Sequence, residues 1–371
     1  MAEDTTGTRR GSRWGNLLLL LVSLLVAGFL AEGVLRLTVA DRVVMFPRFH
    51  DAADYGPFVL RRMRPGTAFT HTSVDGSWDF TINAQGFRDT ADWTRARPEG
   101  TFRVLVLGDS HTQGYEVAQD ETYARVIERL LARRGLEAEV LNTGVSGFST
   151  AEALAFLESE GLAYAPDAVV LGFFRNDFED NLKAGLYALS EEGRLETVKT
   201  RHVPGVWVLD IVHAVPGMAW LSQHSYLYSI GFNTAWRLAK EALLSRRKAE
   251  MRTEYAVSTK EEVEDRTTAL ALAILERMHA VTREAGIPLV LLEIPSKRGA
   301  DGFGPSIPED SLAAFRARSD ALIRAGTVLG PYRGLARFHR PNGHHHINPL
   351  AHLLLGKAAG EAVLERAAPP R

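Results

Sequence analysis

From residue 100 onward, short apolar runs alternate with stretches whose apolar residues recur at helical spacing. Apolar runs of this length predict sheet strands. Near-continuous apolar strands separated by helices are typical of a parallel sheet that is covered on both faces. We therefore predict an α/β fold, with strands at residues 103–107, 138–141, 167–172 and 287–294.

Capping signals mark where the intervening helices begin. A Ser or Thr followed three residues later by Glu is a capping-box pair, and Asn followed by Pro is typical of the start of a helix. The expected helices are 121–134, 149–161 (Ser149 with Glu152), 259–285 (Thr259 with Glu262), 306–325 (Ser306 with Glu309) and 348–366 (Asn348 with Pro349).

The apolar run near the N-terminus has a different pattern, because it is apolar on every face. Residues 17–31 contain no charge, and three arginines precede them. With flanking charges that can reach the lipid headgroups, residues 17–37 are long enough for a transmembrane signal anchor. The positive flank places residues 1–16 in the cytoplasm and the rest in an extracytoplasmic or periplasmic location. Cleavage after Ala40 is an alternative, and we favour an uncleaved, single-pass anchor.

Two regions do not follow the alternation of strands and helices. Residues 38–100 read as a linker with a small β element at 78–82, which we expect to pack on the main domain of residues 101–366. Residues 182–257 form an insertion with scattered aromatic residues. It could be a lid over the site or a face against the membrane, and a local core is the favoured interpretation.

Charge and cysteine content narrow the function. The 371 residues include 43 Lys and Arg against 45 Asp and Glu, a net charge of −2, so nucleic acid is not an expected partner. The chain contains no cysteine, which excludes disulfides, cysteine-ligated zinc and a thiol nucleophile.

Polar residues follow several strands at the point where each strand ends. Ser110 follows the first strand directly, and Gly147 and Asn176 follow the second and third. The carboxyl ends of parallel strands share one edge of a sheet, where ligand sites form. His346, before the last helix, would supply a base there. The alternative is an ordinary turn in which Asp109 or Ser110 caps the next helix.

Four blocks of sequence resemble the SGNH (GDSL-type) hydrolase family, in its membrane-anchored bacterial type. The match spans roughly residues 100–365, and the blocks occur in the family's order: 108–112, 142–147, 172–177 and 346–352. The resemblance implies a flavodoxin-like, three-layer α/β/α fold without a cofactor.

The same resemblance implies roles for individual residues. Ser110 would be the nucleophile and His346 the general base, and Ser110, Gly147 and Asn176 would form the oxyanion hole. Apart from the resemblance, the position of His111 beside Ser110 predicts that it shapes the mouth of the pocket. Asp177 is expected to brace its loop, and a part in the active site is left open.

One departure from the family pattern concerns the acid that orients the base. The family's acid usually lies two or three residues before the catalytic histidine, where this chain has His344 and Gly343. The site could work as a Ser–His dyad oriented by Asn342 or a backbone carbonyl, or an acid could come from elsewhere. Loss of activity is the third alternative, because such an acid contributes about 10⁴-fold to kcat.

The sequence therefore favours an ester hydrolase that forms an acyl-Ser110 intermediate. O-acetylated carbohydrate or cell-surface glycan is the expected substrate. The alternatives are a polysaccharide O-acetyltransferase on the same fold and a catalytically impaired glycan-binding module. No metal site is expected at the adjacent histidines 344–346, because neighbouring residues do not point to one side and no carboxylate lies beside them.

Overall fold

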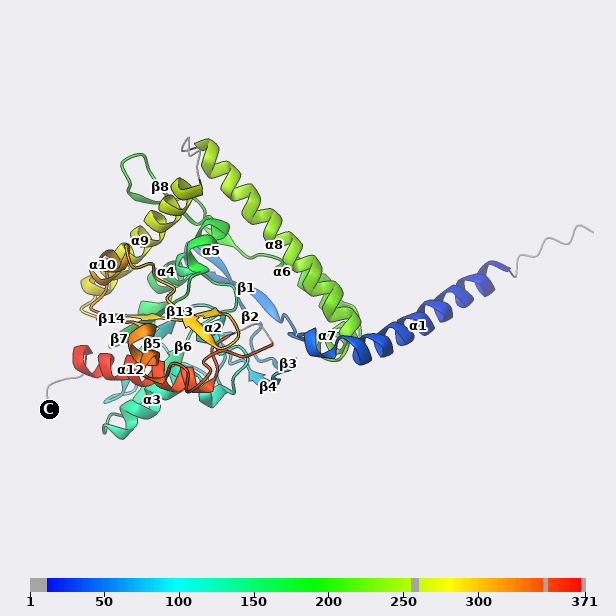
Figure 1. The fold of residues 1–371 in the computed structure, drawn as a ribbon, viewed down its shortest axis with the longest axis horizontal. Coiled ribbons are helices and arrows are strands. Elements are labelled where there is room, and N and C mark those ends of the chain that lie inside the picture. The colour runs from blue at the N-terminus through cyan, green and yellow to red at the C-terminus, as the bar shows by residue number, and fades with distance from the viewer. Residues whose placement is uncertain (1–11, 255–259, 343–345, 368–371) are drawn as a thin grey trace, which may run out of the picture.

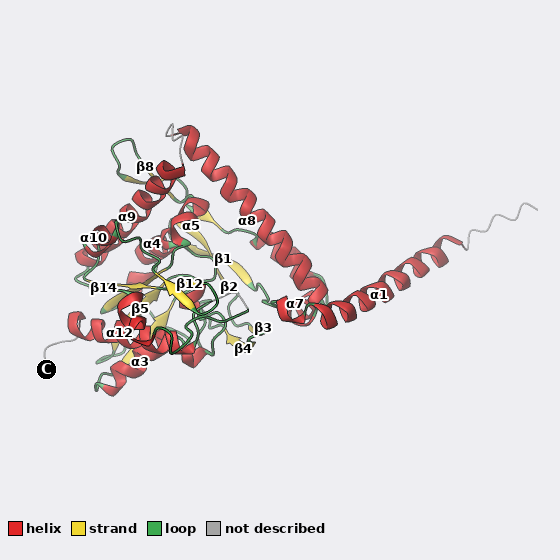
Figure 2. Ribbon diagram, viewed as in Figure 1, coloured by secondary structure: helices red, strands yellow, loops and turns green. Residues whose placement is uncertain are grey.

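A five-stranded parallel sheet forms the centre of the protein (Figures 1 and 2). The computed structural model describes residues 12–254, 260–342 and 346–367. Each neighbouring pair of strands in the sheet is parallel, so the predicted α/β class is confirmed. The strand order is β14 (Ala321–Ile323), β11 (Leu289–Glu293), β7 (Ala168–Phe173), β5 (Phe102–Leu107) and β6 (Ala138–Asn142).

Alternate side chains of the strands face opposite helix layers, as the pleat of a strand requires. On β5, Leu105 and Leu107 belong to the core cluster shared with α4 and α9. Val104 and Val106 belong to the cluster shared with α3 and α12. The predicted three-layer α/β/α arrangement is thereby confirmed. The layer helices are α3 (Tyr123–Arg133), α4 (Thr150–Ser159), α5 (Asp177–Ala184), α9 (Lys260–Glu284) and α12 (Pro349–Ala367).

Two of the predicted helix starts are confirmed by their hydrogen bonds. The backbone N–H of Ser149 donates to the Glu152 carboxylate at 2.9 Å, and the Ser149 hydroxyl oxygen accepts the Ala151 N–H at 3.2 Å. The Asn348 side chain accepts the Ala351 N–H at 3.0 Å and so opens α12. The expected cap at Thr259 lies outside the described residues.

The helix expected over residues 306–325 is wrong. The Ser306 hydroxyl donates to the carbonyl of Ile294 instead of capping a helix. The helix there is only α10 (Leu312–Arg316), and β14 follows it. The Asp320 carboxylate accepts the Leu289 N–H at 2.8 Å, which anchors β14 beside β11. This long-range pairing overrides the local capping signal.

The segment before the sheet forms two small β structures that pack against the site region. The β element expected at 78–82 corresponds to β4. Phe69 and Phe80 stack at 4.9 Å, and Phe46 covers them. The strands are β1 (His50–Tyr55) antiparallel to β2 (Phe58–Met63), β10 (Arg201–His202) parallel to β2, and β3 (Ala68–Ser73) antiparallel to β4 (Gly76–Thr81).

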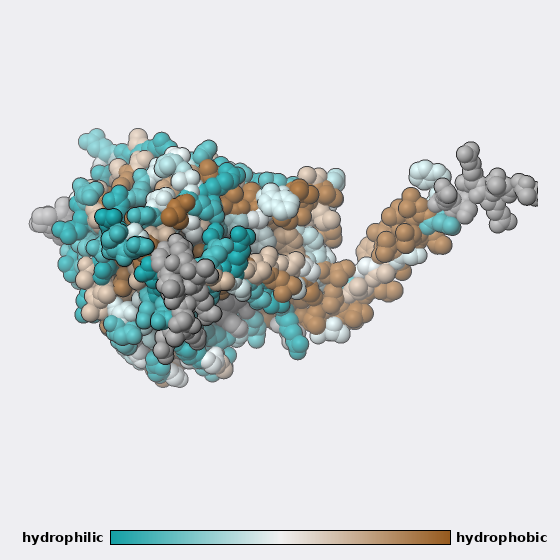
Figure 3. All heavy atoms as spheres, turned by 90° about the horizontal axis from the view of Figure 1, so that it is seen from above, coloured by the Kyte–Doolittle hydropathy of each residue, from teal (hydrophilic) through white to brown (hydrophobic). Residues whose placement is uncertain are grey.

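The N-terminal helix α1 (Ser12–Thr38) leaves the body of the protein and meets the long helix α8 (Tyr226–Glu254) at its end (Figure 1). The Glu32 carboxylate accepts the N–H groups of Tyr226 and Leu227 at 2.9 and 3.0 Å, so α1 caps α8. Residues 14–38 are apolar and long enough to cross a membrane, and α1 forms an exposed apolar rod (Figure 3).

Within the described part of the insertion, residues 182–254, the aromatic side chains differ in exposure. Trp207 and Trp220 lie on α6 and α7 with 67% and 60% of their surface exposed. The remaining elements are α2 (Ser110–Gln113), α6 (Val206–Ala214), α7 (Met218–His224), α10 (Leu312–Arg316), α11 (Ala325–Leu329), β8 (Tyr187–Leu189), β9 (Leu195–Thr197), β12 (Ser296–Arg298), β13 (Gly302–Gly304) and the 3-10 turns at Ala40–Arg42, Gln119–Glu121, Gly161–Tyr164 and Gly330–Tyr332.

Candidate active site

Ser110 stands where β5 turns into the short helix α2 at the carboxyl edge of the sheet. Gly108 ends the strand with φ +149°, and a Cβ there would lie 2.1 Å from Thr112 Oγ1, so only glycine fits. The Asp109 carboxylate accepts the His111 N–H at 2.8 Å and caps α2. The turn therefore serves both as a helix cap, through Asp109, and as part of the site, because Ser110 faces the cavity.

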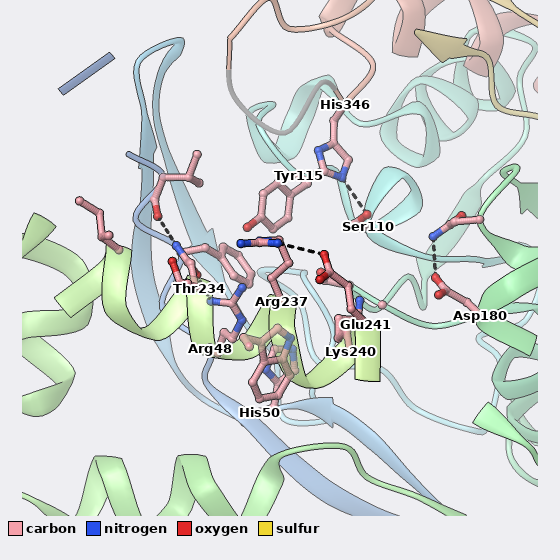
Figure 4. Close-up of a pocket in the computed structure, with 18 of the residues that line it drawn as sticks. Arg48, His50, Ser110, Tyr115, Asp180, Thr234, Arg237, Lys240, Glu241 and His346 are labelled. Atoms are coloured by element: carbon pink, nitrogen blue, oxygen red, sulfur yellow. Dashed lines mark hydrogen bonds and ion pairs between the residues drawn. The ribbon is translucent and has the colours of Figure 1, made fainter. Parts of the chain in front are cut away.

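His346 lies beside Ser110, although 236 positions separate them in the chain. The Ser110 Oγ is 2.8 Å from His346 Nε2, and both side chains point into one cavity (Figure 4). The rings of Tyr115 and His111 pack at 4.7 and 4.6 Å from the imidazole. The His346 carbonyl accepts the Arg340 N–H at 2.8 Å. These contacts fix the ring in the orientation that meets the serine.

A carboxylate that the sequence analysis missed lies on the far side of His346. Glu116 Oε2 is 3.7 Å from His346 Nδ1, and the Glu116 side chain is fully buried. Its backbone is left-handed, with φ +62°, which is uncommon for a residue other than glycine and occurs at functional sites. The side chain of Arg340 donates to the Glu116 carbonyl at 2.9 Å and holds this turn. The only signal in the sequence is a charge between Tyr115 and Val117.

The second oxygen of Glu116 faces a histidine from the N-terminal hairpin. Glu116 Oε1 is 3.9 Å from Nε2 of the buried His71. Burial by itself would raise the pKa of the Glu116 carboxyl, but its interactions with His346 and His71 outweigh burial and hold that pKa below its usual range. Glu116 is therefore ionised at neutral pH, and the segment expected only to pack contributes to the surroundings of the site.

The three predicted oxyanion donors lie around the same cavity. Ser110, Gly147 and Asn176 all line it. Within the described residues, the N–H groups of Ser110 and Gly147 donate to no protein acceptor. The Asn176 amide donates one N–H to Asp180 at 2.8 Å, which orients it and leaves its second N–H for another acceptor.

Of the three residues considered as orienting groups, Asp177 and Asn342 do not contact His346 in the described structure. Asp177 accepts the N–H groups of Thr150 and Phe174 at 3.0 and 2.8 Å, so it braces its loop. Burial, and then the nearby Asp109, raise the pKa of the Asp177 carboxyl. Asn342 is paired with Asp75 through two hydrogen bonds of 3.0 Å. His344 lies outside the described residues.

The cavity over Ser110 has a volume of about 970 Å³. Its walls come from three parts of the chain: the serine edge of the sheet, the strand β1–β2 region, and α8 of the insertion (Figure 4). Leu35 and Val39, at the end of α1, also line it. The insertion thus covers the site as one of its walls.

The fold is that of an α/β/α hydrolase, with Ser110 and His346 side by side at the carboxyl edge of its sheet. A model of the GDSL-like lipase/acylhydrolase family matches residues 106–325, more than half of the chain. The chain belongs to this family, whose members hydrolyse ester bonds.

Individual relatives are distant. An arylesterase of Vibrio mimicus is 29% identical over 82 residues, which span 22% of this chain and 41% of that protein. A lipase/acylhydrolase from Enterococcus faecalis is 17% identical, with 73% of this chain and 99% of that chain covered at a TM-score of 0.39. An acetyl xylan esterase, AlAXEase, is 12% identical, with coverage of 71% and 100% at a TM-score of 0.37.

Proposed function

We propose that the protein is a serine ester hydrolase in which Ser110, His346 and Glu116 act as one unit. The observation that carries this proposal is the alignment of Ser110 Oγ, the imidazole and the Glu116 carboxylate, at 2.8 and 3.7 Å. A nucleophile, a base and a group that orients the base are the parts that serine acyl transfer requires. Glu116 takes the place of the acid that is missing before His346.

In the first half-reaction, His346 Nε2 accepts the proton of the Ser110 hydroxyl as Oγ attacks the ester carbonyl carbon. The negative charge that develops on the carbonyl oxygen is received by the N–H groups of Ser110 and Gly147 and by the Asn176 amide. Glu116 stabilises the imidazolium. The C–O bond then breaks, and the alcohol leaves with the proton from His346.

In the second half-reaction, water attacks the acyl-Ser110 carbonyl while His346 accepts a proton from it. The acyl–Oγ bond breaks, the proton passes to Ser110, and a carboxylic acid is released. Both half-reactions use the same donors for the oxyanion. Because the proton returns to Ser110, the enzyme ends in its starting state.

The substrate and the location are also part of the proposal. An O-acetylated carbohydrate outside the cytoplasmic membrane is the proposed substrate class, and acetate release from an acetylated oligosaccharide measures it. The apolar, exposed α1 supports a role as a membrane anchor. A reporter fused after residue 45 should be active outside the cytoplasm, and activity only in the cytoplasm contradicts this topology.

The nucleophile can be tested without knowledge of the substrate. The full-length protein in detergent should react with a fluorophosphonate, and mass spectrometry should place one adduct on the Ser110 peptide. Labelling requires the serine to be activated by its base, so a folded protein that shows no adduct, or an adduct on another serine, contradicts the proposal.

A further inference from the structure

The cavity over Ser110 carries an excess of positive charge that its own carboxylates do not balance. Its described carboxylates already have cationic partners at salt-bridge distance. These pairs are Glu179 with Lys248 at 2.6 Å, Asp180 with Lys183 at 2.5 Å, and Glu241 with Arg237 at 3.0 Å.

Three other cations in the cavity wall lack such a partner. Arg48, Arg61 and Lys240 have no carboxylate within 4.0 Å among the residues that the structure describes. Arg48 is held by Asn233 at 2.6 Å and by the ring of Trp236. Arg48 precedes β1, Arg61 lies on β2 and Lys240 lies on α8, so none of the three cations belongs to the central sheet or its layer helices. Figure 4 labels Arg48 and Lys240 in the cavity wall.

Arg61 is the most constrained of these cations. Its side chain is 5% exposed, it donates to the Ser146 carbonyl, and its Nε has no hydrogen-bond partner in the described structure. Burial lowers the pKa of the guanidinium to about 10, which leaves it charged at neutral pH. Glu152 and Asp180 act on Arg61 only from beyond salt-bridge distance. A buried charge without a carboxylate in direct contact is costly, and an anionic ligand lowers that cost.

The cations stand next to the reacting centre. Arg61 Nη2 lies 2.6 Å from the position that a Cβ on Gly147 would occupy, and Lys240 Nζ lies 4.0 Å from it. His50, buried in the same wall, has no hydrogen-bond partner on either ring nitrogen within the described residues. The positive charges of Arg61 and Lys240 therefore lie directly beside Gly147, the predicted oxyanion glycine. The His50 ring adds hydrogen-bonding groups in the same cavity wall.

We propose that Arg48, Arg61 and Lys240 form a subsite for an anionic group, a phosphate or a carboxylate, that the ester substrate carries close to its acyl bond. The inference rests on the proposed hydrolase function for the reaction itself. The anionic group pairs with the cations while the ester carbonyl lies between Ser110 and Gly147. Leu35 of α1 and Val39 just after it line the same cavity, so the anion can belong to a soluble ester or to a lipid headgroup.

Binding to the full-length Ser110→Ala variant tests the subsite separately from catalysis. Two matched pairs serve as probes: 4-acetoxybenzoate with its methyl ester, and monooleoyl phosphatidylglycerol with monooleoyl phosphatidylcholine in the same micelles. In at least one pair the anionic member should bind roughly tenfold more tightly. The pair that shows the preference identifies the soluble or the lipid source. No preference in either pair overturns the proposal, even if the wild-type enzyme hydrolyses esters.

Variants in the same background assign the effect to residues. Arg61→Gln and Lys240→Gln should each remove most of the preference for the anion. Lys240 is exposed, so its replacement remains informative if Arg61→Gln does not fold. Arg246→Gln, on the same helix but outside the cavity and paired with Glu250, should keep the full preference. A preference that survives undiminished in both cavity variants also overturns the subsite.

Discussion

Replacing Ser110 by alanine is expected to lower kcat for p-nitrophenyl acetate by about 10⁶-fold, to the level of the oxyanion donors alone. The reason is that Ser110 Oγ is the atom that His346 Nε2 reaches at 2.8 Å, and no other hydroxyl is paired with this imidazole in the described structure. Steady-state hydrolysis by the full-length protein in detergent measures the effect.

Ser190→Ala provides the matched control for this loss. Ser190 lies in an exposed turn between β8 and β9, where its hydroxyl donates to Glu192, and it does not line the cavity. Its replacement should leave kcat unchanged. Turnover by Ser110→Ala within tenfold of the wild-type rate would rule out Ser110 as the nucleophile.

Replacing Glu116 by glutamine should lower kcat by roughly 10³- to 10⁴-fold, by the logic of a triad that loses its acid. Glutamine keeps the size of the side chain but removes the negative charge that stabilises the imidazolium. Its amide can also donate to Nδ1, which would leave the proton on Nε2, where it opposes proton transfer from Ser110. Hydrolysis of the same ester, with the melting temperature recorded in parallel, checks the prediction.

Glu192→Gln is the control for the charge change, because Glu192 is exposed and pairs with Arg194 far from the cavity. Glu116→Asp should retain more activity than Glu116→Gln, since it keeps the charge at a longer distance. A Glu116→Gln protein that is folded and fully active would mean that His346 works without an acid, as a dyad.

Much of the fold was predictable because it depends on local pattern. Three of the four predicted strands, β5, β7 and β11, are buried along their whole length, and strands buried on both faces are mostly apolar runs. The edge strand β6 is buried only over its last three residues. The place of Ser110 at the carboxyl edge follows from the same cause, since Ser110 directly follows a strand of the parallel sheet. His346 comes to it from the loop before α12. β14 could not be predicted, because only three residues pair there and β11 supplies the pairing.

The carboxylate beside His346 depends on contacts between distant segments. The direction of Glu116 is set by a positive φ and by Arg340, which lies 224 positions away. His71 and Arg61 reach the site from a region that the sequence showed only as a short β element. Nothing in the sequence around Glu116 indicates that its side chain is buried. Its position beside His346 can therefore be recognised only in the folded structure.

The account's central claim is that Glu116 acts through His346, and a double-mutant cycle tests it most directly. The measurement is kcat for p-nitrophenyl acetate in the wild type, Glu116→Gln, His346→Ala and the double variant. If the residues form one unit, Glu116→Gln costs roughly 10³-fold or more in the wild type and almost nothing once His346 is absent. Equal losses from Glu116→Gln in both backgrounds would contradict the claim.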